Sequence, residues 1–395
     1  MPEQVGLPPP LFWPFPAAQE ITEVLEWRTD VLQARSGEQR LALRPQPREI
    51  VTFRHRLDAL GMARATELAR AAFASNWLVP LWHMALQPNA DLAQGAMEIL
   101  LDTGLSDFRV GGYASVACAE VAMAGEDATA VQIAAIQPDR LILSAPLVLP
   151  TSGAIVAAGQ ITVAPIREGV LTSAIEIVRR RQSDGMVTAS FLLRDTPDLT
   201  APVLPTYLGR PVQVDPSLLR QPLSANLRLA VEYVDNGFGP VVVEPIRELF
   251  ERRETITLKA QDAADRWALR RWLWSLRGRQ ASFWLPTWGH ELQLRAPMSA
   301  GATLMRVAPI GPIAQLIGRR IALEVSDTLR FRTITAAIED DFEHRLSLSS
   351  SPGTPMPLGT KVHLLTLVRA DTDRVEISHG VGTSEVSLPV IEVPA

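Results

Sequence analysis

The chain has 395 residues, a hydrophobic fraction of 47% and a formal net charge of −5 at pH 7. This length is too great for one ordinary hydrophobic core, and the weak net charge gives no general case for nucleic-acid binding. Cys118 is the single cysteine, which excludes an internal disulfide framework and any cysteine-based zinc or iron–sulfur site. No stretch resembles a membrane span or a secretory signal, so we predict no membrane insertion.

The chain begins with a proline-rich segment, residues 1–19, that contains the aromatic residues Phe12, Trp13 and Phe15. So many prolines favour an extended arm that has too few turns to fold alone. The aromatic side chains carry too much apolar surface to be left in water. We therefore predict that the arm packs against a neighbouring subunit or protein and not against its own core. Its deletion would then impair assembly and leave the monomer folded.

Residues 20–100 are typical of a unit made of a strand, a hairpin, a strand and a helix. Alternating residues and a Ser-Gly turn signal predict strands over Glu23 to Leu32, Gln39 to Leu43 and Arg48 to Leu57. Apolar residues at helical spacing follow from about Asp58. The unit ends in an aromatic element with a proline two residues before a tryptophan, Trp77-Leu78-Val79-Pro80-Leu81-Trp82.

Residues 101–195 contain short apolar runs separated by turn signals, a pattern typical of a small β barrel or sandwich. Residues 196–216 are rich in proline and indicate an extended linker between two halves of the chain.

The second half repeats this plan in residues 217–297 and 298–395. Strands are predicted over Asn226 to Tyr233, Val241 to Glu244 and Arg252 to Leu258. The next helix has Asp262 as a predicted N-cap and Gly278 at the C′ position. It leads to a second aromatic element, Phe283-Trp284-Leu285-Pro286-Thr287-Trp288. The last segment predicts a second small β domain.

Several short sequences recur in the same order about half a chain apart. They are Ala134-Ala135-Ile136 and Ala336-Ala337-Ile338, Arg140-Leu141-Ile142-Leu143-Ser144 and Arg345-Leu346-Ser347-Leu348-Ser349, and Ile175-Glu176-Ile177 and Val375-Glu376-Ile377. An ordered series of this kind indicates a tandem duplication. The predicted fold class is therefore mainly β with a few helices, a duplicated β-sandwich-plus-helix unit with a small β-barrel or sandwich domain in each copy.

The sequence contains no nucleotide-binding loop, serine elbow or zinc-binding histidine pair. His83 and His290 each lie beside one aromatic element, and we interpret them as ordinary surface or core histidines and not as metal ligands. The sequence therefore predicts no enzyme activity, no catalytic residue, no cofactor and no metal. Besides the arm aromatics, the candidate interface residues are Trp77, Trp82, Trp284 and Trp288, because aromatic side chains in a repeat suit core or subunit-interface packing.

The motifs resemble one known family. They are Glu26-Trp27-Arg28-Thr29-Asp30-Val31, Gly37-Glu38-Gln39-Arg40-Leu41-Ala42-Leu43-Arg44 with Pro47-Arg48, and Phe283-Trp284-Leu285-Pro286-Thr287-Trp288. This pattern resembles that of siphophage tail-tip proteins, the distal tail and baseplate hub proteins built on the tail-tube fold. The resemblance covers the first ninety residues best and residues 205–295 less, since the second copy lacks the Gly-x-Glu-Gln-Arg motif.

The resemblance implies a structural protein of the virion, made in the host cytoplasm, that forms part of a ring around the DNA channel. Its partners would be copies of itself, the tail tube protein, the tape measure protein and other tail-tip proteins, and DNA would pass without specific binding. Three copies with two units each would build a six-unit ring, which we favour over a ring of six copies. Two other classes stay open, a stand-alone binding module, for example for carbohydrate, and an enzyme with a site between the halves.

Overall fold

The protein is represented by a computed structural model that describes residues 10–394 except for 18–19, 35, 72–75, 119–127, 150, 152–153, 174, 196–198, 216, 219–223, 229–230, 246–250, 327 and 341. Its secondary structure is 49% strand and 12% helix, with two α-helices, which confirms the predicted mainly β class. Residues 1–9 of the arm lie outside the described residues.

The first half builds a four-stranded antiparallel layer in the order β14-β15-β5-β2, with a helix packed on β5 and β15. Its elements are β2 (Ile21–Glu26), β5 (Arg48–Asp58), α1 (Ala59–Ala71), β6 (Trp77–Pro80), β13 (Ile161–Leu171), β14 (Glu176–Arg179) and β15 (Asp184–Leu193). A hairpin, β3 (Thr29–Gln33) and β4 (Glu38–Ala42), is inserted between β2 and β5. The strand β6 continues the sheet by pairing with β13.

The second half repeats these pairings in the order β28-β29-β21-β18. Its elements are β18 (Ala225–Arg228), the hairpin β19 (Val231–Val234) and β20 (Val242–Pro245), β21 (Glu251–Ala260), α2 (Ala263–Leu276), β22 (Ser282–Pro286), β27 (Val362–Ala370), β28 (Arg374–His379) and β29 (Ser384–Glu392). The two aromatic elements occupy the same place, because Pro80 faces Ile166 on β13 and Pro286 faces Leu365 on β27. The strand pairings therefore bear out the internal duplication.

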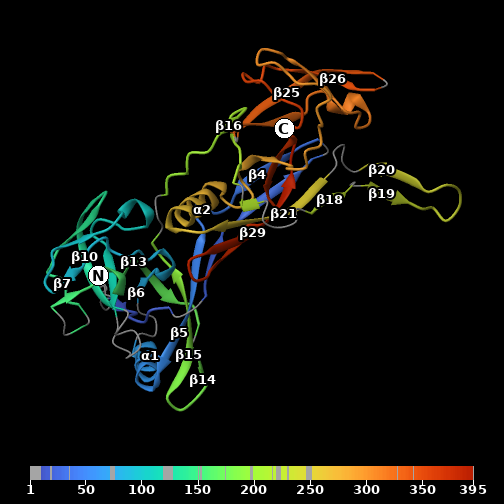
Figure 1. Ribbon diagram of the computed structural model, residues 1–395. Helices are drawn as coiled ribbons and strands as arrows, with labels where there is room; N and C mark the ends of the chain where they lie inside the picture. Colours follow the sequence, from blue (N-terminus) through green and yellow to red (C-terminus); the bar gives the residue numbers. More distant parts are fainter. Residues whose placement is uncertain are drawn as a thin grey trace, which may run out of the picture.

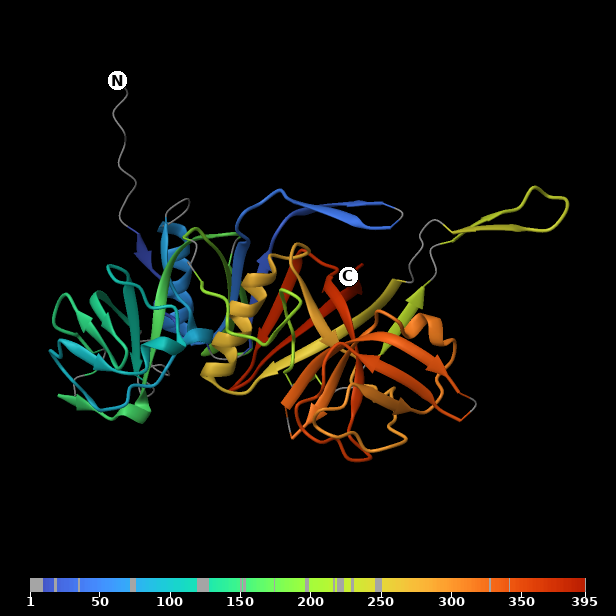
Figure 2. The ribbon, with the colours of Figure 1, turned by 90° about the horizontal axis from the view of Figure 1, so that it is seen from above.

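Each half also carries a small β domain (Figures 1 and 2). The first contains β8 (Glu98–Leu100), β9 (Tyr113–Cys118), β10 (Thr129–Gln137) and β11 (Arg140–Leu143), with short β7 (Leu92–Ala93) and β12 (Ile155–Val156). The second contains β23 (Leu304–Val307), β24 (Arg320–Val325), β25 (Thr328–Glu339) and β26 (His344–Leu348).

The sheet crosses the boundaries expected at residues 100 and 297. The strands β13 to β15 and β27 to β29 follow the small β domains in sequence, yet they pair with β5, β6, β21 and β22 of the preceding units. Each small domain is thus an insertion, and β13 and β27 run from the layer into it by pairing with β9 and β24. The predicted domains consist of consecutive segments, whereas in the structure strands that are far apart in the chain pair to form one layer.

The two halves are joined into one eight-stranded antiparallel layer. The strand β2 pairs with β28 over six residues, from Ile21 opposite His379 to Glu26 opposite Arg374. We call this β2–β28 contact the internal joint. It leaves β14 and β18 as the outermost strands, at opposite ends of the layer (Figure 1).

The described part of the arm packs against its own core, which contradicts the sequence prediction. Its first strand, β1 (Leu11–Phe12), pairs in parallel with β6, and Trp13 and Phe15 are fully buried. The Trp13 ring makes edge contacts with Phe15 at 5.0 Å and with Trp77 at 5.4 Å between centroids. The sequence predicts correctly that these rings must be buried, but only the fold shows that residues of β5, β6 and β15 cover them.

The helix α2 begins and ends close to the predicted positions. Asp262 is the N-cap and its side chain accepts a hydrogen bond from the Asp265 backbone N–H at 2.8 Å. Arg277 takes the left-handed C-cap conformation and Gly278 follows with a φ of 63°. The linker contributes the short pair β16 (Thr206–Tyr207) and β17 (Arg210–Pro211), and Val212 behind it is fully buried.

Candidate functional site

A buried network of charged side chains spans the internal joint. Arg270 extends from α2 in the second half, and its guanidinium donates to Glu23 Oε1 on β2 at 2.8 Å and to Glu49 Oε1 on β5 at 2.5 Å. All three side chains are almost completely buried. The network is not fully satisfied, since Glu49 Oε2 and Arg270 Nη1 are buried without a hydrogen-bond partner among the described residues, and the nearest further charge to Arg270 is Asp107 at 4.0 Å. The two hydrogen bonds of Arg270 nevertheless couple the second helix to the first layer.

The network continues into the first small β domain. Asp107 lies 4.0 Å from Arg270 and accepts a hydrogen bond from Arg167 on β13 at 2.6 Å. Arg167 also donates to Asp195 at 2.6 Å, and Arg109 donates to both aspartates. The guanidinium of Arg167 is fully buried. Every buried charge named here has an opposite charge beside it, as a low-dielectric interior requires.

Two histidines complete the network at the end of the internal joint. His379 on β28 bonds Glu23 Oε2 through Nε2 at 3.0 Å and Ser384 Oγ through Nδ1 at 2.8 Å. His83 stacks on His379 with ring centroids 4.5 Å apart, and its Nε2 is 3.4 Å from the same Glu23 oxygen. One carboxylate of the first half thus meets one histidine from each half.

The buried surroundings shift the pKa values of Glu23, Glu49 and His83 in different directions. Burial raises the pKa of Glu23, but Arg270 and the two histidines outweigh it and hold the pKa well below the ordinary value. For Glu49 burial prevails over Arg270, so its pKa is raised. Burial lowers the pKa of His83 well below the ordinary value and leaves this imidazole neutral. Arg270 and ionised Glu23 form the ion pair at the centre.

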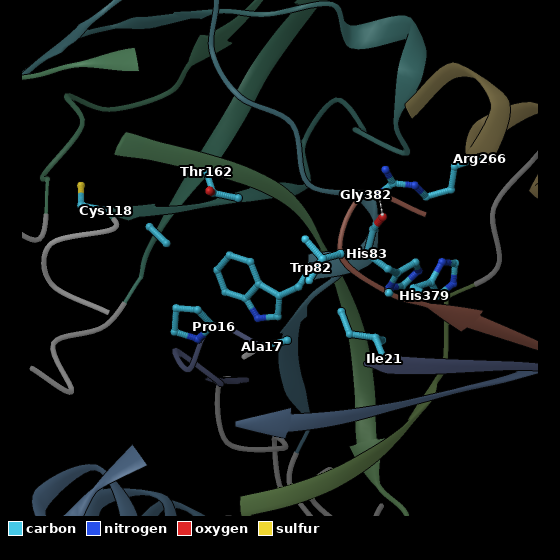
Figure 3. Close-up of a pocket in the computed structure, with 13 residues that line it drawn as sticks. Pro16, Ala17, Ile21, Trp82, His83, Cys118, Thr162, Arg266, His379 and Gly382 are labelled. Carbon is cyan, nitrogen blue, oxygen red and sulfur yellow. Dashed lines mark hydrogen bonds between the residues drawn. The ribbon is translucent and has the colours of Figure 1, made fainter. Parts of the chain in front are cut away.

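A pocket of about 290 Å³ lies beside the histidines. Figure 3 shows Trp82, Ile21 and Pro16 on its walls and the His83 and His379 rings at one end. Arg266 of α2 closes that end by donating to the His83 carbonyl. The pocket therefore lies between the arm, the first aromatic element and the β28–β29 turn, so it too joins the two halves.

Glu23, His83 and His379 have the side-chain types of a metal site, with their ligand atoms within 4.8 Å of one another. Their orientation is less suited to this role. The imidazole planes are inclined by only 26° and stacked, whereas a metal lies near the plane of each ring that binds it. Glu23 is moreover held by Arg270 and His379. The arrangement suits a structural ion-pair network better than a cation site.

Most of the aromatic residues predicted for an interface lie in the core of the chain itself. Trp13, Phe15 and Trp77 are fully buried, and Trp82 and Trp284 are 9% and 3% exposed. These five side chains are core residues, so their assignment to an interface is wrong. The Trp284 indole donates to the Tyr207 carbonyl at 2.7 Å.

Phe12 and Trp288 are half-buried. The two histidines named from the sequence differ in their surroundings, since His83 faces Glu23 while His290 lies near His363.

The sequence did not indicate Glu23, Glu49 and Arg270 as buried residues, because charged residues in amphipathic strands and helices ordinarily face water. Only the strand alternation could have indicated the two glutamates, because it places Glu23 on the same face as the buried Ile21 and Leu25, and Glu49 on the same face as the buried Val51.

No known protein family model matches the chain, and no curated protein sequence is similar to it. Neither of the two helices that the structure describes is long and apolar enough to cross a membrane.

Proposed function

We propose that this protein is a structural ring component of a siphophage tail tip, in which copies join edge to edge around a DNA channel. The observation that supports this most strongly is the pair of outermost strands. The strand β18 occupies the place of β2 in the second half, and β14 occupies the place of β28 in the first half. One chain therefore presents both sides of its own internal joint, one at each end of the layer.

The positions of these two edges correspond one to one with the positions of the internal joint. In the internal joint Leu25 faces Val375, and both are buried. The equivalent residues at the outer edges are Leu227 on β18 and Ile175 beside β14, because each follows the same strand pairings. Leu227 is 69% exposed in the single chain. Pairing β18 with β14 of a second copy would bury this leucine as Leu25 is buried, and would satisfy two strand edges that otherwise attract other chains.

A contact between two different surfaces of one chain is head-to-tail, and it builds a closed ring if the rotation returns to its start. With two equivalent units in each copy, three copies give a ring with six units. The small β domains, which lie outside the eight-stranded layer, are free to contact the other tail-tip proteins (Figure 1). The channel would contact DNA only by surrounding it.

The proposal is tested by the size of the assembly that the purified protein forms. Mass photometry over a dilution series and electron microscopy of the particles measure this size. We expect trimeric rings. Leu227→Asp places a charge in the centre of the new strand pair and is expected to give monomers. Leu358→Asp changes a leucine that is 60% exposed on the second small β domain and serves as the matched control. A wild-type protein that stays monomeric, or a Leu227→Asp variant that assembles normally, would contradict the proposal.

A further inference from the structure

The two halves carry equivalent hairpins that meet different environments. The hairpin β3–β4 lies between β2 and β5, and the hairpin β19–β20 lies between β18 and β21. The connections on both sides have the same lengths in the two halves, so the residues correspond one to one. Thr29 opposite Ala42 corresponds to Val231 opposite Pro245. The hairpin β19–β20 extends clear of the rest of the chain in both views (Figures 1 and 2).

The first hairpin is docked on the second half by a buried ion pair. Glu38 on β4 accepts two hydrogen bonds from Arg369 on β27, at 2.7 and 3.0 Å. The Arg369 side chain is 2% exposed. Two residues further along the same face, Arg40 donates to the Gln280 carbonyl at 2.5 Å. This hairpin thus reaches across the internal joint and covers the adjoining sheet of the other half.

The second hairpin presents an apolar version of the same face. Its residues at the positions of Glu38 and Arg40 are Val241 and Val243, and Tyr233 lies directly opposite Val243. The exposed fractions of Val241, Val243 and Tyr233 are 50%, 50% and 69%. A two-stranded hairpin is marginally stable without a surface to pack on. An apolar face of this kind on an isolated hairpin is typical of a surface that another protein covers.

The receiving surface changes in the same way between the halves. Arg369 lies four residues beyond the β27 residue that faces Pro286, and Val170 lies four residues beyond the β13 residue that faces Pro80. Val170 is therefore the first-half equivalent of Arg369. It is half-buried beside Leu192, to which it pairs on β15. Where the internal contact is Glu38 with Arg369, the outer surfaces thus offer Val241 and Val170.

We propose that the hairpin β19–β20 of one copy docks by its Val241, Val243 and Tyr233 face on the first-half sheet of a second copy, at Val170 and Leu192. This inference rests on the proposed ring, because the edge pair β18–β14 brings these surfaces together. Because valines replace both members of the ion pair, each hairpin fits its own site and not the other. The first hairpin would bury Glu38 without a cation at Val170. The second would remove Glu38 from the buried Arg369 and leave Asp371, at 3.3 Å, as its remaining carboxylate partner. Each hairpin therefore discriminates against the other site.

A charge-exchange experiment tests the contact between Val241 and Val170. Val241→Glu alone and Val170→Arg alone each place an unpaired charge in an apolar contact, so we expect self-association to weaken about tenfold or more. Combining both substitutions recreates the Glu38–Arg369 pair between copies and is expected to restore assembly. Val243→Glu, on the same face, should act like Val241→Glu. Glu232→Lys, on the opposite face, is the matched control and should assemble normally.

Mass photometry at several concentrations measures these effects, with circular dichroism of each variant as a check on folding. If Val241→Glu assembles like wild type while Leu227→Asp does not, the hairpin contact is wrong and the ring stands. If both single variants weaken assembly and the double variant does not recover, Val241 and Val170 are not partners. If the wild-type protein never assembles, the proposed ring is wrong and this contact is wrong with it.

Discussion

At the scale of single residues, His55 illustrates how a buried neutral histidine anchors the arm. Its Nε2 accepts the Trp13 indole N–H at 3.0 Å, and its Nδ1 lies 3.0 Å from the Pro16 carbonyl. These contacts require the neutral tautomer with the proton on Nδ1. Burial lowers the pKa of His55 to about 4, and the Pro16 carbonyl only partly opposes this shift. Protonation would place a second N–H against the Trp13 donor.

The protein is therefore expected to lose stability as the pH falls below neutral. The folded pKa of His55 lies below the unfolded value, so its contribution is complete above about pH 6.5 and is lost towards pH 4, a change on the order of 3 kcal/mol. His83 shifts in the same direction. His55→Gln keeps an acceptor for Trp13 and a donor for Pro16 but cannot titrate. Denaturant unfolding at pH 7 and pH 4.5 should show a smaller loss for His55→Gln, and equal losses would refute the assignment.

Arg270 connects α2 of the second half to β2 and β5 of the first half. Replacing it by Met, of similar length, leaves Glu23 and Glu49 buried without their common cation. Loss of one partner of a buried ion pair typically costs about 3–5 kcal/mol. Denaturant unfolding of Arg270→Met should show this loss, while the triple variant with Glu23→Gln and Glu49→Gln should recover part of it. Unchanged stability in Arg270→Met would mean that the network does not hold the halves together.

At the scale of elements, the arm is a core strand of the first half and not a free extension. The rings of Trp13 and Phe15 fill the space between β6 and the β5–β15 face, where Phe191 lies 5.4 Å from Trp13. Trp13→Ala would leave a cavity and is expected to cost about 3–5 kcal/mol. Thermal unfolding measures this, with Phe342→Ala, an aromatic residue that is 84% exposed, as the control. A Trp13→Ala variant as stable as wild type would restore the idea of an arm without a core role.

The helix α2 places Arg266 and Arg270 beside the internal joint, so the stability of its first turn affects their position. The Asp262 side chain caps this turn. Asp262→Ala is expected to destabilise the protein by about 1 kcal/mol, because it leaves a backbone N–H of the first turn without its acceptor. Asp262→Ser keeps a capping oxygen and should retain most of the stability. Chemical denaturation of both variants compares them, and an equal loss would show that the cap does not set the position of the helix.

At the scale of the whole molecule, a buried network of charges spans the internal joint, whereas the proposed joint between copies has Leu227 at its centre and exposed charges, such as Glu176 and Arg228, beside it. Glu23 and Glu49 of the internal joint correspond to Ala225 and Arg252 at the outer edge, which cannot form the same network around an arginine. The two kinds of contact should therefore respond differently to the solvent.

We expect assembly of the ring to be little affected by salt, because apolar contacts are not screened as exposed charge pairs are. Raising the ionic strength should leave the trimer population nearly unchanged in mass photometry. A loss of assembly at high salt would show that exposed charges, and not the Leu227 and Val241 contacts, join the copies.

Local sequence patterns were enough to predict the mainly β class, the two helices, the caps of α2 and the duplication. These features depend on local periodicity, on turn and capping residues, and on repeated motifs that survive in the chain order. The pairing of Pro80 and Pro286 with equivalent strands agrees with that reading.

Tertiary structure alone decided which segments share a layer, where the arm lies and which charges are buried. The strands β13 to β15 join β5 across an inserted domain, Trp13 enters its own core, and Glu23 meets Arg270 from the other half. Each of these depends on contacts between residues far apart in the chain. The sequence does not show which distant residue a strand edge, an aromatic ring or a charged side chain will contact. Burial and strand pairing are therefore determined only when the layers pack together.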